Sequence, residues 1–312
     1  MDLRATQLIV GGLASNSRRS YYLAATRYLN FCDLYSLDPF NISESTVLRF
    51  ISYLSSSFIA PSTIKVYLSG VRAWVITNGG PPPLIYSQRV RWALKCLERV
   101  APPPVRVNPF TFDMFLIVSE HLTYSYDNVF LYCSMLLGYF GCLRAAEYLP
   151  SAGSPPLLPS HFKLHLAPVP YYIINIQSSK TAQKGFSLVV GCSGSGVCAV
   201  CWLRHCFQIR TLPPSLPFFS FHSGAPITRS ALAAFMQRSL ARAGRDASGI
   251  SPHSLRAGSA TDAAGLGASD SAIQRLGRWR SSAYTAYIRP APLQQASMAN
   301  WLASAHRHPA TN

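Results

Sequence analysis

The stretch that decides the fold is SPHSLRAG at residues 251–258. Its His253 and Arg256 are three residues apart, so they share one face if the segment is helical. The tetrapeptide LGRW follows at residues 276–279, and Tyr287 comes shortly after it. This spacing places a histidine, an arginine, a tryptophan and a tyrosine within one short region of the chain.

Two cations lie upstream of that region. Arg144 follows a long apolar stretch, and Lys180 lies in a polar turn between two strand-like runs. Phosphodiester transfer without a metal needs a nucleophile, a base, cations for the charge that develops on the phosphoryl oxygens, and an acid for the leaving oxygen. These residues can supply all four, because a tyrosine is a nucleophile and a guanidinium binds two phosphate oxygens in one plane.

Composition favours a folded protein with a polyanionic partner. The chain has 312 residues, 49% of them hydrophobic, and a formal net charge of +16. Nucleic acid is the usual partner of such a chain, although an anionic membrane surface also fits. The longest apolar run, residues 129–143, is too short for a membrane span and predicts a buried helix. No secretory signal is visible and the 8 cysteines are scattered, which indicates a soluble, intracellular protein.

Hydrophobic periodicity divides the chain into two parts. Residues 1–104 show four helical patterns, and Ser43 and Ser62 stand where helix N-caps are expected. A proline-rich segment, residues 101–108, is a candidate linker. We therefore expect a helical domain over residues 1–104 and a larger domain over 105–312.

The larger part predicts a mainly α domain with one small antiparallel β-sheet. The expected strands are residues 162–166, 171–176 and 186–190. The expected helices are residues 111–122, 128–148, 199–209, 229–243, 253–264, 269–276, 283–288 and 292–305.

Four motifs together resemble the tyrosine recombinases, or phage-type integrases. They are GCLRAAE at residues 141–147, IQSSKT at 176–181, PHSLRAG at 252–258, and LGRW through YIR at 276–289. The resemblance covers nearly the whole chain, from about residue 15 to residue 305. The amino-acid sequence of the C-terminal half, above all IQRLGRW at residues 273–279, is most similar to recombinases of eukaryotic DIRS and Crypton mobile elements.

The resemblance implies a fold, a reaction and a set of site residues. The fold is a SAM-like helical core-binding domain followed by a tyrosine recombinase catalytic domain, together closing around double-stranded DNA. Tyr287 attacks the scissile phosphate and forms a 3′-phosphotyrosine, with His253 as general base and Lys180 as general acid. The groups that stabilise the phosphorane are Arg144, Arg256 and Trp279, and Glu147 orients Arg144 or His253.

The same resemblance implies the partners. The family acts as a homo-tetramer on paired DNA sites and needs no cofactor, no metal and no small-molecule substrate. Residues 292–305, with Met298, Trp301 and Leu302, form an apolar stripe that suits docking into a neighbouring subunit or packing on the chain's own core. No membrane partner is expected, and the likeness to eukaryotic elements implies a nuclear protein.

Three assignments have a rival. Counting back from Tyr287, the family's His or Trp position falls on Arg278 or Trp279, and Trp279 is favoured because its indole N–H can donate to a phosphoryl oxygen. Tyr284 lies one turn before Tyr287, which is favoured by the following Ile-Arg pair. Lys184 is a rival of Lys180 in the same turn.

Four cysteines close together raise the question of zinc. Cys198 and Cys201 have the spacing of a zinc ligand pair, but Cys192 and Cys206 form no second such pair. Buried thiols on a helix are therefore the favoured interpretation.

Other functions remain open on sequence alone. A domesticated DNA-binding protein would keep the fold without recombining. A type IB topoisomerase would use the same chemistry as a monomer, and a membrane-surface binder is a third option.

Overall fold

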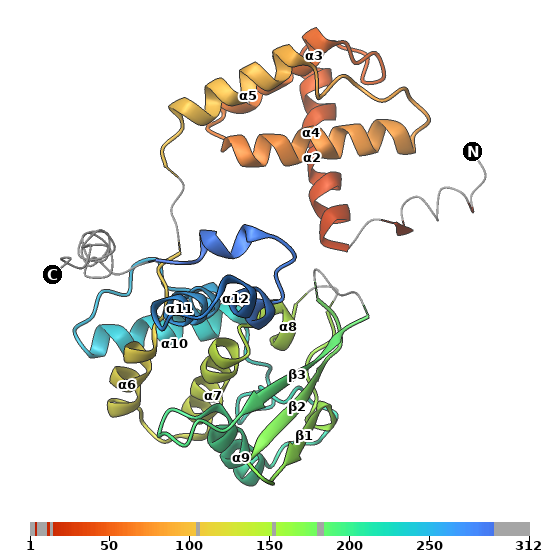
Figure 1. Cartoon of the computed structure of the whole chain (residues 1–312). Helices are drawn as coiled ribbons and strands as arrows, with labels where there is room; N and C mark the ends of the chain where they lie inside the picture. The colour runs from red at the N-terminus through yellow and green to blue at the C-terminus, as the bar shows by residue number, and fades with distance from the viewer. Residues whose placement is uncertain are drawn as a thin grey trace, which may run out of the picture. The chain divides into compact units, whose positions relative to one another are not determined.

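The computed structural model describes residues 4, 11–12, 15–103, 107–151, 154–179 and 184–289. Contacts divide the chain into two units, Met1–Pro104 and Val105–Asn312 (Figure 1). Each unit contains a hydrophobic core of its own, so each is treated by itself.

Residues 15–103 of the first unit contain four helices, as the periodicity predicts. They are α2 (Ser15–Leu34), α3 (Glu44–Ser56), α4 (Pro61–Thr77) and α5 (Gln88–Val100). The cap prediction is confirmed at Ser43, whose Oγ accepts a hydrogen bond from the N–H of Thr46 at 3.1 Å. It is wrong at Ser62, because α4 begins at Pro61 and Ala60 is the N-cap. Proline suits the first helical position, where its missing N–H would have no partner within the helix.

The core of the first unit is aromatic. Tyr28 and Phe31 of α2 both contact Phe50 of α3, with ring centroids 5.2 Å apart in each pair. All three side chains are buried, together with aliphatic residues of α3 and α4. Edge-on and tilted ring pairs of this kind add to the free energy of burial.

The second unit is mostly helical with one small sheet, which confirms the predicted fold class (Figure 1). Its helices are α6 (Phe112–Glu120), α7 (Tyr126–Phe140), α8 (Ala145–Tyr148), α9 (Ala199–Ile209), α10 (Arg229–Arg242), α11 (Pro252–Gly265) and α12 (Asp270–Gly277), with the short 3-10 turns η1 (Pro159–His161) and η2 (Ser282–Ala286).

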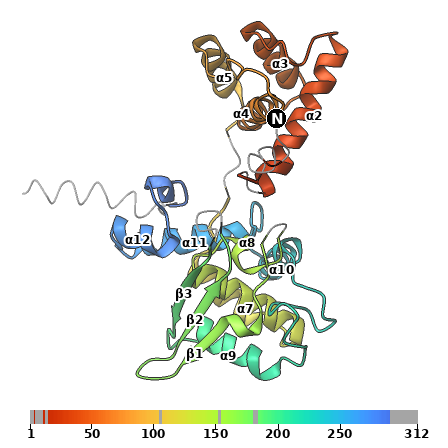
Figure 2. The same cartoon turned by 90° about the vertical axis from the view of Figure 1, so that its right-hand side faces the viewer.

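The sheet is antiparallel in the order β1 (Phe162–His165), β2 (Tyr171–Ile176), β3 (Phe186–Gly191). Each strand agrees with its prediction to within one residue. Tyr172 of β2 lies opposite Leu164 on one side and Val190 on the other. Alternate residues of β2 are buried against the helical core, and Figures 1 and 2 show the sheet beside α7 and α9.

The helix α7 is the centre of the second core. Every residue from Val129 to Tyr139 is buried, as the apolar run predicts. None of the helices among the described residues is long and apolar enough to cross a membrane. The prediction of one helix over residues 128–148 is wrong, because α7 ends at Phe140 and α8 starts only at Ala145. Between them Cys142 has a φ of 45°, in the left-handed region, which a right-handed helix cannot contain.

Close contacts fix α11 against the start of the unit. A Cβ on Gly258 would lie 1.8 Å from the carbonyl oxygen of Phe110, so only glycine allows this approach. The carboxylate of Asp262 accepts hydrogen bonds from the Tyr139 hydroxyl at 2.5 Å and from the Phe112 N–H at 2.8 Å. The middle and the last turn of α11 are thereby held against the start of α6 and the end of α7.

The chain after α12 forms the shorter element η2 in place of the helix predicted over residues 283–288. The predicted helix over residues 292–305, with Met298, Trp301 and Leu302, lies outside the described residues.

Candidate active site

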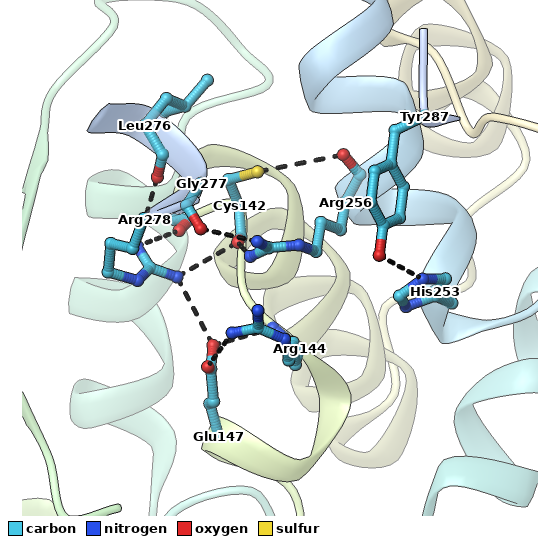
Figure 3. A network of polar contacts seen from close by, with 10 residues as sticks. Cys142, Arg144, Glu147, His253, Arg256, Leu276, Gly277, Arg278 and Tyr287 are labelled. Atoms are coloured by element: carbon cyan, nitrogen blue, oxygen red, sulfur yellow. Dashed lines mark hydrogen bonds and ion pairs between the residues drawn. The ribbon is translucent and has the colours of Figure 1, made fainter. Parts of the chain in front are cut away.

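His253 and Tyr287 form the centre of the site. His253 is the second residue of α11, and Tyr287 follows η2 directly. The His253 Nε2 lies 3.1 Å from the Tyr287 hydroxyl oxygen, which is hydrogen-bond distance (Figure 3). Thr261, two turns along α11, donates its hydroxyl to the Tyr287 carbonyl at 3.0 Å and so fixes the backbone of the tyrosine. A phenol held against an imidazole in this way can lose its proton to that imidazole.

The two rival tyrosines occupy different environments. Tyr284 is 3% exposed and packs with Ala260 and Ile273 in a small apolar cluster. Burial and a hydrogen bond to the Asp270 carboxylate raise the pKa of Tyr284. Tyr287, by contrast, lines a cavity. The geometry therefore favours Tyr287 as a nucleophile and assigns Tyr284 to packing.

The pKa of His253 is lowered, first by burial and then by the positive charges of Arg256 and Arg144. The neutral imidazole is consequently the main form near pH 7, and this is the form that accepts a proton.

Three guanidinium groups gather around one buried carboxylate (Figure 3). Glu147, whose side chain is 1% exposed, is 3.0 Å from Arg144 Nη1 and 3.4 Å from Arg278 Nη2. It also accepts the backbone N–H of Arg144 at 2.9 Å, which fixes Arg144 at the start of α8. One carboxylate cannot neutralise three cations, so this group keeps a net positive charge.

Arg256, the third guanidinium of this group, does not line the cavity. Its side chain is fully buried and donates from Nη1 to the carbonyl of Cys142 and from Nη2 to that of Gly277. Trp279 covers it, with the guanidinium carbon 4.1 Å from the ring centroid. The structure thus brings Arg256 next to the other site residues but holds it with backbone carbonyls.

Arg278 and Trp279, the two candidates for the family's His or Trp position, both line the cavity. Arg278 ends α12 in the left-handed conformation, with φ 57°, and donates to the carbonyls of Gly141 at 3.1 Å and Cys142 at 3.1 Å. Trp279 turns back over Gly277, where a Cβ would come within 1.8 Å of its ring. The LGRW motif therefore covers the last two residues of α12 and the turn after them, and both its arginine and its tryptophan line the cavity.

The cavity has a volume of about 660 Å³ and a basic lining. Among the described residues its wall contains four arginines and no carboxylate. The charged and polar lining residues are Arg144, His253, Arg278, Arg280, Ser281, Tyr287 and Arg289. Such a concave, cationic wall that includes a tyrosine and a histidine suits a phosphate diester.

Two of these arginines, Arg280 and Arg289, were given no role from the sequence. Both lie within the last motif, residues 276–289: Arg280 directly follows Trp279, and Arg289 ends the YIR triplet. The lysines are a different case. Lys180 lies outside the described residues, and Lys184 is an exposed turn residue just before β3.

Comparison with known proteins supports the fold. No family model and no curated protein matches the chain. Among solved structures, the XerH site-specific recombinase bound to palindromic difH substrate is 17% identical, with a TM-score of 0.64 over 91% of this chain and 80% of that one. A lambda integrase dimer bound to a COC′ core site is 16% identical, with a TM-score of 0.58 over 92% and 75%.

A transposon integrase gives the same result. The Tn1549 integrase in complex with circular intermediate DNA is 12% identical, with a TM-score of 0.51 over 83% of this chain and 85% of that one. At these identities the similarity is one of architecture. The chain therefore has the tyrosine recombinase fold.

Proposed function

We propose that this protein is a site-specific DNA recombinase or integrase, which breaks and rejoins DNA strands through Tyr287. The observation that carries the proposal is the 3.1 Å contact between Tyr287 and the His253 imidazole in the wall of a cavity with four arginines. The residues proposed as nucleophile, base and cations thus lie together in one site.

In the proposed reaction the Tyr287 oxygen attacks the scissile phosphorus as His253 takes the phenolic proton. The new tyrosine–phosphorus bond replaces the bond to the 5′ oxygen, which leaves as a hydroxyl with a proton from Lys180. A 3′-phosphotyrosine remains, and the reverse reaction with another 5′-hydroxyl reseals the strand. The covalent bond conserves the energy of the phosphodiester, so the reaction has no need of ATP.

The cations stabilise the charge on the phosphoryl oxygens. Arg144 and Trp279 line the cavity and can donate to a phosphate there. Arg256 acts on the phosphate only if it exchanges its hydrogen bonds to Cys142 and Gly277 for phosphate oxygens. Glu147 positions Arg144 through two hydrogen bonds.

The partners follow from the resemblance and from the structures of similar fold, which are DNA complexes. Double-stranded DNA is the proposed substrate, bound by a homo-tetramer on paired sites in the nucleus. Integration or excision of a mobile element is the proposed purpose.

The test is covalent capture of DNA. The full chain is incubated with randomised nicked duplexes, denatured in detergent, and the DNA that stays attached is sequenced. We expect adducts with the wild-type chain and with Tyr284→Phe, and none with Tyr287→Phe, whose DNA affinity stays near that of wild type.

Two other results would change the proposal. An adduct that persists in Tyr287→Phe means that another residue is the nucleophile. No adduct from a wild-type chain that binds the same DNA favours the second candidate, a DNA-binding protein of this fold that does not cleave. The full burial of Arg256 behind Trp279 is the observation that favours this candidate.

A further inference from the structure

Three cysteine thiols lie together at the far end of β3, and none of them lines the Tyr287 cavity. Cys192 directly follows β3, Cys198 is the N-cap of α9, and Cys201 lies in the first turn of α9. Their Sγ atoms all lie within 4.8 Å of one another. The fourth cysteine of the region, Cys206, is buried in the core and does not belong to the group.

The spacing of the sulfurs fits a metal ion. Cys192 Sγ is 3.5 Å from Cys198 Sγ and 3.9 Å from Cys201 Sγ. A tetrahedral zinc ion with Zn–S bonds of about 2.3 Å holds its sulfurs about 3.8 Å apart. A disulfide bond would bring two of them to about 2.05 Å. Two of the three sulfur–sulfur distances are thus close to the tetrahedral spacing, and the third is within 4.8 Å, so a zinc ion can fill the position between the sulfurs.

We propose that Cys192, Cys198 and Cys201 bind a zinc ion. His205, whose ring nitrogens lie outside the group of sulfurs within 4.8 Å of one another, becomes the fourth ligand when its side chain turns towards the ion. His205 lies one turn after Cys201 on α9, and both residues line a second cavity of about 310 Å³. Three thiolates and one imidazole form an ordinary structural zinc set. The order along the chain is C-x5-C-x2-C-x3-H, with the first cysteine at the end of a strand and the rest on a helix.

Hydrogen bonds within the loop of residues 193–197 keep Cys192 and Cys198 close together. The N–H of Ser193 points to Cys198 Sγ at 3.4 Å, and such a contact stabilises a thiolate. The hydroxyls of Ser193 and Ser195 donate to the Val197 carbonyl at 3.3 Å and 3.1 Å. These bonds hold the loop so that its two end cysteines meet.

The ion would join β3 to α9. β3 forms one edge of the described sheet, and its other end follows the turn that holds Lys184. Zinc at Cys192 would fasten this strand to the helical core independently of any reaction at Tyr287. Binding replaces the thiol protons, which pass to solvent, and adds to the stability of the folded chain.

The test uses the full chain, stripped of metal under reducing conditions and titrated with Co²⁺ and then Zn²⁺. We expect one Co²⁺ per chain, with absorption from sulfur-to-cobalt charge transfer and from a tetrahedral ligand field, and its loss when Zn²⁺ is added. The Zn²⁺ affinity should fall at least about tenfold in Cys201→Ser and in Cys192→Ser, since each removes a ligand. Cys96→Ser, an exposed cysteine of the first unit, is the matched control and should bind as wild type does.

His205→Ala should keep the charge-transfer band, change the ligand-field bands and weaken Zn²⁺ binding. Unchanged spectra and affinity would remove His205 from the site. Cobalt spectra without a sulfur band would overturn the proposal, as would Cys201→Ser binding Zn²⁺ like wild type. Cys201 is exposed, so its replacement should not disturb the core, and circular dichroism checks that the variant is folded.

Discussion

At the scale of single residues, the lowered pKa of His253 makes a prediction about pH. Burial comes first among its causes, followed by Arg256 and Arg144. A general base works in its unprotonated form, so the cleavage rate should be on its plateau at pH 7 and fall as the pH drops through the lowered pKa. We expect the inflection in single-turnover cleavage of a nicked duplex to lie below 6.5, the ordinary value for histidine.

A variant tests whether the neighbouring positive charges contribute to the lowered pKa of His253. Arg144→Gln removes one of the positive charges near His253, so the inflection should move up towards the ordinary value although the plateau rate falls. If the wild-type inflection lies at or above 6.5, His253 is not the neutral base that its surroundings indicate.

Glu147 is the residue on which the cationic group depends. It is the carboxylate that pairs with both Arg144 and Arg278, and its side chain is 1% exposed. Glu147→Ala leaves two half-buried guanidiniums without a counter-ion, which should cost about 3–5 kcal/mol of the free energy of unfolding in urea.

The matched control is an exposed ion pair. Lys65 and Glu98 pair on the first unit with side chains 50% and 46% exposed. Glu98→Ala should therefore cost only about 0–1 kcal/mol. Equal losses in the two variants would mean that the Glu147 carboxylate adds nothing beyond a surface pair.

At the scale of secondary-structure elements, the contact between α11 and Phe110 makes a prediction about packing. In Gly258→Ala a Cβ would lie 1.8 Å from a backbone oxygen, which cannot turn aside as a side chain can. The helix or the segment before α6 must shift, at a cost of about 1–3 kcal/mol or more in urea unfolding.

The strand end offers a control for this glycine. A Cβ on Gly191 would meet nothing within 4 Å and its φ is not positive, so Gly191→Ala should stay within about 0.5 kcal/mol of wild type. A loss in Gly258→Ala no larger than this would show that α11 moves freely against Phe110.

Sequence periodicity predicts the helices and strands well where the pattern of neighbouring residues determines their bounds. The three strands and the helices α9 and α10 agree with it to within one residue. The alternation of β2 and β3 and the helical period of α9 and α10 are local patterns of apolar residues, which the sequence displays directly. The break after α7 was not predicted. Cys142 adopts a left-handed φ there, and its carbonyl is held by Arg256 and Arg278, both more than a hundred residues away in the chain.

The site, too, depends on contacts between distant parts of the chain that no local sequence pattern predicts. No local pattern brings His253 to Tyr287, which is 34 residues further along, so their pairing was expected only from the resemblance to a family. The resemblance also named Arg256 without showing that it lies beneath Trp279. The four cysteines of this region were interpreted as buried thiols on a helix. That is wrong for Cys192, which lies at the end of a strand, and for Cys201, which is exposed.

At the scale of the whole molecule, charge is the dominant property. The chain carries +16, and in each of the two units Lys and Arg outnumber Asp and Glu. The cavity at Tyr287 has four of these arginines in its wall. If DNA is the partner, binding must release the cations that surround its phosphates, and the affinity must depend strongly on salt.

We therefore expect the logarithm of the DNA-binding constant to fall linearly with the logarithm of salt concentration, with a slope of about −0.9 per phosphate bound. Tyr287→Phe changes no charge and should keep the wild-type slope. Arg289→Gln removes a cation from the cavity wall and should make the slope less steep by about 1. Fluorescence anisotropy on one duplex over a salt series measures the slope for the wild type and for both variants. A slope near zero would rule out phosphate contacts as the source of affinity, and an unchanged slope in Arg289→Gln would place the bound phosphates away from this cavity.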